Sequence, residues 1–135
     1  LPVYIDTDGI RQVLLNIINN AKFAMHGGGV FSVSAEVLTP GENWSFYQDK
    51  DSHKPNPKKI MRLKFTDTGM GIRQEDMEKI FEPFFTTKPE EKGTGLGLSV
   101  SYSIIEKHSG RLEVESQVGV GTTVVIDLPC HDLLN

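Results

Sequence analysis

The sequence has little cysteine, no long apolar run and no excess of basic residues. Its 135 residues include one cysteine, Cys130, which excludes a framework of internal disulfides and fits a reducing compartment. No stretch approaches the roughly 18 consecutive apolar residues of a membrane-spanning helix, and no signal-peptide pattern opens the chain. The 14 Lys and Arg residues face 18 Asp and Glu residues, which argues against duplex nucleic acid because binding its phosphates needs a basic field. We therefore expect a cytoplasmic protein without direct contact to a membrane or to nucleic acid.

Glycine, by contrast, is frequent and clustered. The chain has 13 glycines, and most of them fall at residues 27–29, at Gly69 and Gly71, and at Gly93, Gly95 and Gly97. Hydrophobic residues at 38% and charged residues at 24% are ordinary for one globular domain with its own core. Because the chain begins at Leu1 rather than Met, we expect residues 1–135 to be one domain of a longer protein.

Hydrophobic periodicity predicts the order of helices and strands. Apolar residues at helical spacing predict a helix over residues 6–25, and alternation predicts strands over residues 30–38, 60–65, 111–116 and 122–128. Shorter helices are expected over residues 74–81 and 97–108, with Gly110 in the left-handed conformation after the second of these. In the first strand, Phe31, Val33, Ala35 and Val37 should face the core. The pattern indicates an α+β fold, with about three helices on one face of a mixed, mostly antiparallel sheet of about five strands.

The polar segment over residues 39–59 is long for a connection between paired strands. We expect it to form a mobile surface excursion. Its Trp44, Phe46 and Tyr47 could form a docking patch, but they are more simply explained as folding back on the sheet.

Two asparagines on the first expected helix are candidate metal ligands. Asn16 and Asn20 are four residues apart, so their side chains share one face of the helix. Mg²⁺ prefers oxygen ligands and keeps waters when it is held against substrate phosphates, so one asparagine carbonyl can be the whole contribution of the protein. Taken alone, the pair is more simply explained as polar residues on a helix surface.

Residues 67–72, with the sequence Asp-Thr-Gly-Met-Gly-Ile, directly follow an expected strand. A carboxylate at a strand end, followed by glycines, places a hydrogen-bond acceptor beside a close approach of the backbone. The exocyclic amino group of adenine is a donor that such a carboxylate can recognise. The alternative is a simple turn, in which Asp and Gly are common for local reasons.

A glycine run precedes the last expected helix. Residues 81–88 read Phe-Glu-Pro-Phe-Phe-Thr-Thr-Lys, and residues 93–98 read Gly-Thr-Gly-Leu-Gly-Leu. Glycines before a helix leave backbone N–H groups free to bind phosphate oxygens, with the helix dipole in support. The spacing matches neither the GxGxxG nor the GxxxxGK[ST] loop.

In this order, the motifs resemble the catalytic and ATP-binding domain of bacterial sensor histidine kinases, within the GHKL ATPase superfamily. Residues 16–21 are similar to its N box, 67–72 to its first glycine box, 81–88 to its F box, 93–98 to its second glycine box and 119–123 to its last hairpin. The resemblance covers nearly the whole chain. It implies the two-layer α/β sandwich called the Bergerat fold, with ATP (or ADP) and Mg²⁺ as cofactors.

The resemblance also implies a role for each matching residue. Asp67 would accept a hydrogen bond from the adenine amino group, with Thr122 nearby, and Asn20 would hold the Mg²⁺ ion. Lys88 would be a cation on the β- or γ-phosphate, within a mobile lid over residues 74–93. The further ATP-binding residues would be Asn16, Gly69, Gly71, Ile72, Thr86, Thr87, Gly93, Thr94, Gly95, Leu96, Gly97 and Leu98.

One position departs from the family pattern. Many members carry a lysine three residues after the metal-binding asparagine, where this chain has Phe23. The adjacent Lys22 points about 100° away around the helix. The basic phosphate contact of the family is therefore not expected from this turn.

Residue chemistry favours histidine as the phosphoryl acceptor. Hydrolysing members of the superfamily, such as the gyrases, and its anti-sigma-type serine kinases carry a glutamate one turn before the metal-binding asparagine. Asn16 stands there in this chain, and an amide cannot take a proton at neutral pH. A neutral imidazole is already nucleophilic and needs no such base. The prediction is an ATP-dependent protein-histidine kinase domain.

The acceptor histidine is expected outside this chain. The four histidines, His26, His53, His108 and His131, lie within or after the ATP-binding pattern. The resemblance places the acceptor on an upstream dimerisation domain, which would feed a response regulator in a homodimeric full-length protein, whether or not an inner-membrane anchor is present. The isolated domain should be monomeric and turn over little ATP. The alternatives are an anti-sigma-type serine kinase and a nucleotide-sensing interaction module.

Overall fold

The computed structural model describes residues 2–41, 57–86, 88 and 97–131. In chain order, the elements are α1 (Thr7–Ala24), β1 (Phe31–Leu38), β2 (Ile60–Asp67), α2 (Gln74–Met77), α3 (Gly97–Lys107), β3 (Arg111–Gln117) and β4 (Gly121–Pro129). The central part of the predicted excursion over residues 39–59, with Trp44, Phe46 and Tyr47, lies outside the described residues. None of the helices in these described ranges is long and apolar enough to cross a membrane.

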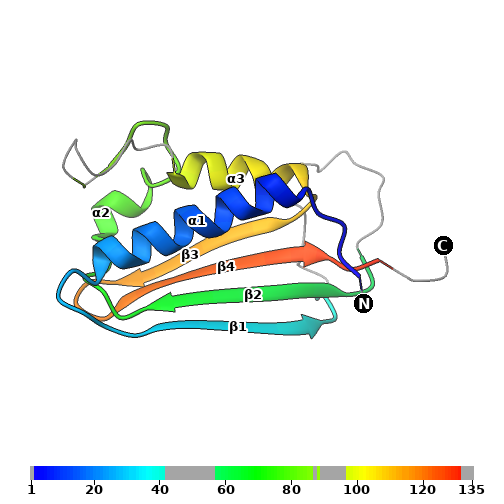
Figure 1. Cartoon of the computed structure of the whole chain (residues 1–135), viewed down its shortest axis with the longest axis horizontal. Coiled ribbons are helices and arrows are strands. Elements are labelled where there is room, and N and C mark those ends of the chain that lie inside the picture. Colours follow the sequence, from blue (N-terminus) through cyan, green and yellow to red (C-terminus); the bar gives the residue numbers. More distant parts are fainter. Residues whose placement is uncertain (1, 42–56, 87, 89–96, 132–135) are drawn as a thin grey trace.

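The fold has two layers, with the helices on one face of the sheet (Figure 1). The sheet has four strands in the order β1-β2-β4-β3, and every neighbouring pair is antiparallel. This confirms the predicted α+β sandwich, although the described strands number four rather than about five and include no parallel pair. Residues 2–5 add no strand, because their only described backbone hydrogen bond to the end of the sheet runs from the His131 N–H to the Pro2 carbonyl.

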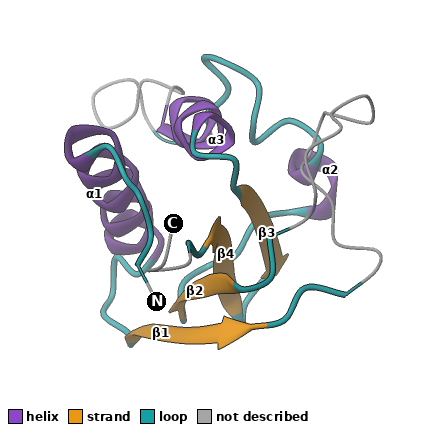
Figure 2. Cartoon of the chain, turned by 90° about the vertical axis from the view of Figure 1, so that its right-hand side faces the viewer, coloured by secondary structure: helices purple, strands orange, loops and turns teal. Residues whose placement is uncertain are grey.

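The core lies between the buried stripe of α1 and the inner face of the sheet. Val13, Ile17 and Ala21 are spaced as one face of a helix and are almost completely buried. Val13 and Ile17 pack with Ile105 of α3 and with alternating residues of β2, β4 and β3, among them Phe65, Leu112, Val124, Ile126 and Leu128. The register places Phe65 opposite Val124 and Leu112 opposite Ile126, so these side chains share one face. The view along the helices shows this face beneath α1 and α3 (Figure 2).

The predicted inward face of β1 is mostly uncovered. Phe31 is half-buried and stacks on Phe65, with 6.4 Å between the ring centroids. Val33 and Val37 point to the same side as Phe65, but they are 58% and 49% exposed. The expectation that this face is buried is therefore wrong for most of the strand. The reason is that β1 lies at the edge of the sheet, whereas α1 contacts the inner strands β2 and β4.

Two predicted helix ends are also corrected. The helix expected over residues 74–81 ends at Met77. The chain continues in turns whose hydrogen bonds join residues three apart, such as Glu82 N–H to Lys79 O. After α3, Ser109 rather than Gly110 adopts the left-handed conformation, with φ of 58°. Gly110 is needed for packing instead, because a Cβ there would collide with the carbonyl oxygen of Asp127 on β4.

Candidate functional site

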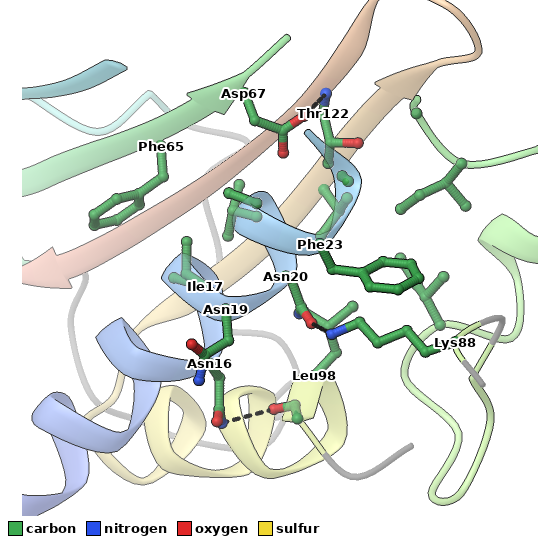
Figure 3. Close-up of a pocket in the computed structure, with 18 of the residues that line it drawn as sticks. Asn16, Ile17, Asn19, Asn20, Phe23, Phe65, Asp67, Lys88, Leu98 and Thr122 are labelled. Carbon is green, nitrogen blue, oxygen red and sulfur yellow. Dashed lines mark hydrogen bonds between the residues drawn. The ribbon is translucent and has the colours of Figure 1, made fainter. Parts of the chain in front are cut away.

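A cavity of about 480 Å³ opens between α1, the start of α3, the inner face of the sheet and the segment after α2 (Figure 3). Its volume is typical of a small-molecule site. Of the residues predicted as site residues, the cavity is lined by Asn16, Asn20, Asp67, Gly71, Ile72, Thr86, Lys88, Gly97, Leu98 and Thr122. Residues from all five motifs therefore meet in one cavity.

The remaining predicted residues comprise Gly69 and five residues whose placement is not described. Thr87, Gly93, Thr94, Gly95 and Leu96 lie outside the described residues. Gly69 packs against the end of α1, where a Cβ would come within 2.6 Å of the Ala24 carbonyl oxygen. The neighbouring Met70 N–H donates to that same oxygen at 3.1 Å. Gly69 thus lets the loop after β2 approach the backbone of α1.

The carboxylate of Asp67 is held at one end of the cavity. Asp67 is the last residue of β2 and is 8% exposed. Its Oδ1 accepts hydrogen bonds from the Gly69 N–H at 2.9 Å and the Thr122 N–H at 3.3 Å. Within the described part of the chain, Oδ2 has no hydrogen-bond partner. The carboxylate is therefore fixed in orientation and can accept an N–H group of a ligand.

Hydroxyl groups continue this polar end. Ser116 Oγ on β3 lies 2.8 Å from Thr122 Oγ1 on β4 and accepts the Ile72 N–H at 2.8 Å. These bonds connect the loop after β2 to the hairpin of β3 and β4. The prediction that Thr122 lies near Asp67 is confirmed, because the two residues are opposite each other in the ladder.

Apolar side chains form the walls beside Asp67. The prediction of site residues missed this group, which comprises Ile17, Phe31, Phe65, Ile80, Phe85, Val114 and Val124. The alternation of the strands could have identified part of this group. Inward-facing residues near the Asp67 end of β2, β3 and β4 lie on the same face of the sheet as the cavity. Such walls suit a flat, apolar ligand surface whose edge reaches the carboxylate.

The opposite end of the cavity carries a cation. Lys88 Nζ donates to Asn20 Oδ1 at 2.6 Å and lies 5.3 Å from the centroid of the Phe23 ring. Lys88 is the only Lys, Arg or His among the described lining residues. Burial lowers the pKa of its ammonium group.

Asn20 has the chemistry of a Mg²⁺ ligand. Its amide oxygen points into the cavity and already binds a cation, the Lys88 ammonium, which shows that the oxygen is available to positive charge. Among the described residues, no three His, Cys, Asp or Glu side chains gather as a metal cluster. The described residues thus suit an ion that takes one amide oxygen from the protein and its other oxygens from phosphates and water.

Asn16 lines the same cavity, but its polar atoms bind protein groups. Its Nδ2 donates to the Gly97 carbonyl and to Ser101 Oγ, both at 3.1 Å, and its Oδ1 accepts from Gln12 Nε2 at 2.9 Å. Asn16 and Asn20 share a helix face as predicted, yet they have different neighbours. Asn16 connects α1 to the start of α3.

The phenylalanines of residues 81–88 differ in their surroundings. Phe81 packs against Tyr102 of α3, with 5.3 Å between the ring centroids, and Phe85 lines the cavity. Phe84 has φ of 69° and is 75% exposed. Phe81 therefore attaches the segment to α3, whereas Phe84 points to solvent.

Comparison with known proteins agrees with this geometry. The family model described as histidine kinase-, DNA gyrase B- and HSP90-like ATPase matches residues 5–132. The chain belongs to this family. It is 38% identical over 128 residues to sporulation kinase E of Bacillus subtilis (strain 168), a match that covers 95% of the chain and 15% of that protein.

Solved structures show the same fold. The mycobacterial sensor histidine kinase MprB superposes with a TM-score of 0.71 at 29% identity, covering 94% of this chain and 74% of that one. Full-length ShkA in complex with AMPPNP superposes with a TM-score of 0.68 at 25% identity, covering 96% of this chain and 23% of that one. This member of the ATPase family therefore has the fold of histidine kinase catalytic domains, and it spans a small part of the length of the kinase it matches in sequence.

Proposed function

We propose that this domain binds Mg·ATP and supplies the γ-phosphoryl group to a histidine on a dimerisation and phosphoacceptor domain of the same protein. That domain would in turn feed a response regulator. The observation that carries the proposal is that the two ends of the cavity differ in charge. One end holds the fixed carboxylate of Asp67, and the other holds the amide oxygen of Asn20 with the ammonium group of Lys88.

The Asp67 end suits adenine. The free Oδ2 would accept the exocyclic amino hydrogen, and the apolar walls would pack on the two faces of the base. Guanine carries a carbonyl oxygen at the corresponding edge, which a carboxylate repels. Full-length ShkA, a similar chain, forms a complex with AMPPNP, which supports an adenine nucleotide as the ligand.

The Asn20 end suits the phosphates. Asn20 would hold Mg²⁺, which neutralises phosphate charge when bound, and Lys88 would add a positive charge from the protein. Thr86, Gly97 and Leu98 line this cavity and complete the proposed contacts. Gly69, Thr87, Gly93, Thr94, Gly95 and Leu96 remain predictions for the same ligand.

We infer that the acceptor lies on another domain. Of the described histidines, none lines the cavity. His108 is engaged elsewhere, since its Nε2 accepts the Asp6 N–H at 2.9 Å and its Nδ1 lies 2.7 Å from the Ile104 carbonyl oxygen. In the proposed transfer, an imidazole nitrogen forms a P–N bond as the bond from the γ-phosphorus to the β–γ bridging oxygen breaks. ADP leaves, and the phosphorylated ring loses a proton to solvent.

Among the described residues, the position one turn before Asn20 on α1 holds no general base of the kind that a serine or water nucleophile requires. Asn16 is an amide whose oxygen and nitrogen are both occupied by hydrogen bonds to protein groups. This favours histidine over serine as the acceptor. The proposal places the domain in the cytoplasm, where ATP is available and the unpaired thiol of Cys130 stays reduced.

Calorimetric titration with Mg·ATP tests the nucleotide site. The wild-type domain should bind, and Asp67→Asn should weaken binding by about 10- to 100-fold, because the amide can direct an N–H group at the adenine amino group. Asp127→Asn is the matched control, since Asp127 is a buried carboxylate that pairs with Arg62 and does not line the cavity. Absence of binding by the wild type would contradict the proposal.

Phosphoryl transfer needs a second experiment. The domain is mixed with its dimerisation domain and ATP labelled on the γ-phosphate, and the expected product is an acid-labile phosphohistidine on the dimerisation domain. An acid-stable phosphoserine would instead identify a serine kinase. Binding without any transfer would leave a nucleotide-sensing module as the function.

A further inference from the structure

We propose that Phe23 is a positioning residue, whose ring holds the ammonium group of Lys88 at the Asn20 end of the cavity for contact with phosphate. The inference rests on the proposed function, in which Lys88 binds the nucleotide. It assigns to Phe23 a role that is distinct from packing.

The geometry brings three side chains together. Phe23 lies three residues after Asn20 on α1, so the two side chains are neighbours on one helix face. Lys88 approaches from the segment after α2, and its Nζ lies both over the Phe23 ring, at 5.3 Å from the centroid, and 2.6 Å from Asn20 Oδ1 (Figure 3). A distance below about 6 Å over the ring face is that of a cation–π contact.

The ring is a suitable partner because it leaves the charge of Lys88 available. A carboxylate partner would neutralise the ammonium and compete with phosphate for it. No ion pair joins Lys88 to an acidic residue in the described part of the chain. The electron-rich face of an aromatic ring attracts a cation without neutralising it.

Asn20 cannot hold Lys88 once the metal is bound. The same amide oxygen is proposed to bind Mg²⁺, and two cations at short range on one oxygen repel each other. The Phe23 ring is the described partner of Lys88 that does not depend on this oxygen. The ring can therefore keep the flexible lysine side chain near the phosphates both with and without Mg²⁺.

The placement of Lys88 matters because α1 itself brings no cation to this end. Lys22 is exposed and does not line the cavity, whereas the adjacent Phe23 is half-buried and does. Burial of the Lys88 ammonium also strengthens its attraction to the ring, since less water screens the charge.

The first test uses the nucleotide-free domain and needs no activity. In NMR spectra, the Hε protons of Lys88 should be shifted upfield by the ring current of Phe23. The shift should persist in Phe23→Tyr, which keeps the ring, and disappear in Phe23→Leu. Unchanged Lys88 shifts in Phe23→Leu would overturn the contact itself.

The second test is a double-mutant cycle on Mg·ATP affinity. We expect Phe23→Leu to weaken binding by about fivefold and Phe23→Tyr to stay within about twofold of wild type. In the Lys88→Met background, Phe23→Leu should have no further effect, because there is no ammonium left to hold. Phe81→Leu is the matched control, since Phe81 packs on Tyr102 and does not line the cavity.

The outcomes separate this inference from the proposed function. If the wild-type domain does not bind Mg·ATP, the proposed function fails and the inference fails with it. If the wild type binds and Phe23→Leu weakens binding equally with and without Lys88, Phe23 acts only by packing. That result would overturn the inference and leave the proposed nucleotide site intact.

Discussion

The side-chain amide of Asn16 donates a hydrogen bond to the hydroxyl of Ser101, at 3.1 Å, and thereby joins α1 to α3. Ser101 is completely buried, and Asn16 Nδ2 also donates to the Gly97 carbonyl at the start of α3. Gly97 and Leu98 line the cavity. Asn16 thus positions the helix start that the proposed phosphates would meet.

Replacing this amide by a carboxylate should therefore destabilise the domain. In Asn16→Asp, both hydrogen bonds from Nδ2 are lost and a negative charge faces the Gly97 carbonyl oxygen. We expect the free energy of unfolding to fall by about 2–3 kcal/mol at neutral pH, measured by chemical denaturation. Asn19→Asp is the control, because Asn19 is exposed on the same helix. Equal stability of Asn16→Asp and wild type would contradict the assigned role.

Because of Lys88, nucleotide binding should weaken at alkaline pH. Burial lowers the pKa of Lys88 below its ordinary value of 10.5, so the folded, nucleotide-free domain releases the proton at a lower pH than the unfolded chain does. Phosphates bind the charged form. Affinity for Mg·ATP should therefore be constant below the lowered pKa and fall as the pH rises through it.

The stability of the nucleotide-free domain should change in the opposite direction. Between the lowered pKa and 10.5, the unfolded chain holds more protons than the folded one, so the contribution of Lys88 to the free energy of unfolding rises with pH.

Titration calorimetry over this pH range measures the affinity for Mg·ATP, and Lys88→Arg should stay charged and show a flat affinity profile. An equal alkaline loss of affinity in Lys88→Arg would assign the titration to another group.

Gly121 is predicted to set the position of Asp67. It begins β4 with φ of 144°, and a Cβ there would collide with the carbonyl oxygen of Asp67. Gly121→Ala should therefore separate the ends of β2 and β4, lower the free energy of unfolding by about 2 kcal/mol or more, and weaken Mg·ATP binding. Gly27→Ala is the control, because a Cβ at Gly27 has nothing within 4 Å. If both variants match wild type in denaturation and titration, the close approach is not required.

Much of the fold could be predicted from local patterns. The stripe of Val13, Ile17 and Ala21 predicts a buried helix face, and the alternation of Val124, Ile126 and Leu128 predicts an inward strand face; both are confirmed. These patterns succeed because side-chain direction follows directly from the helical and strand repeats. Alternation failed for Val33 and Val37, since it indicates which side a residue faces but not whether another element covers it.

The candidate site could be predicted in part for a similar reason. Asp67 and Asn20 became candidates from a strand end and a helix face, and the resemblance of their motifs to the first glycine box and the N box assigned their roles, because both signals depend on nearby residues in the chain. The partner of Asn16 and the contact between Phe23 and Lys88 could not be predicted in this way. They depend on how α1 lies against α3 and on where the segment after α2 crosses α1.

The sequence by itself determined the elements, the order of the motifs and the family, because periodicity and motif spacing are local properties of the chain. Only the tertiary structure decided which face of β1 is covered, that Asn16 binds α3, and that Lys88 lies between Phe23 and Asn20. The physical reason is that burial and hydrogen-bond partners arise from packing between distant segments. One repeat pattern is compatible with many such packings, and a single arrangement brings the carboxylate and the cation to opposite ends of one cavity.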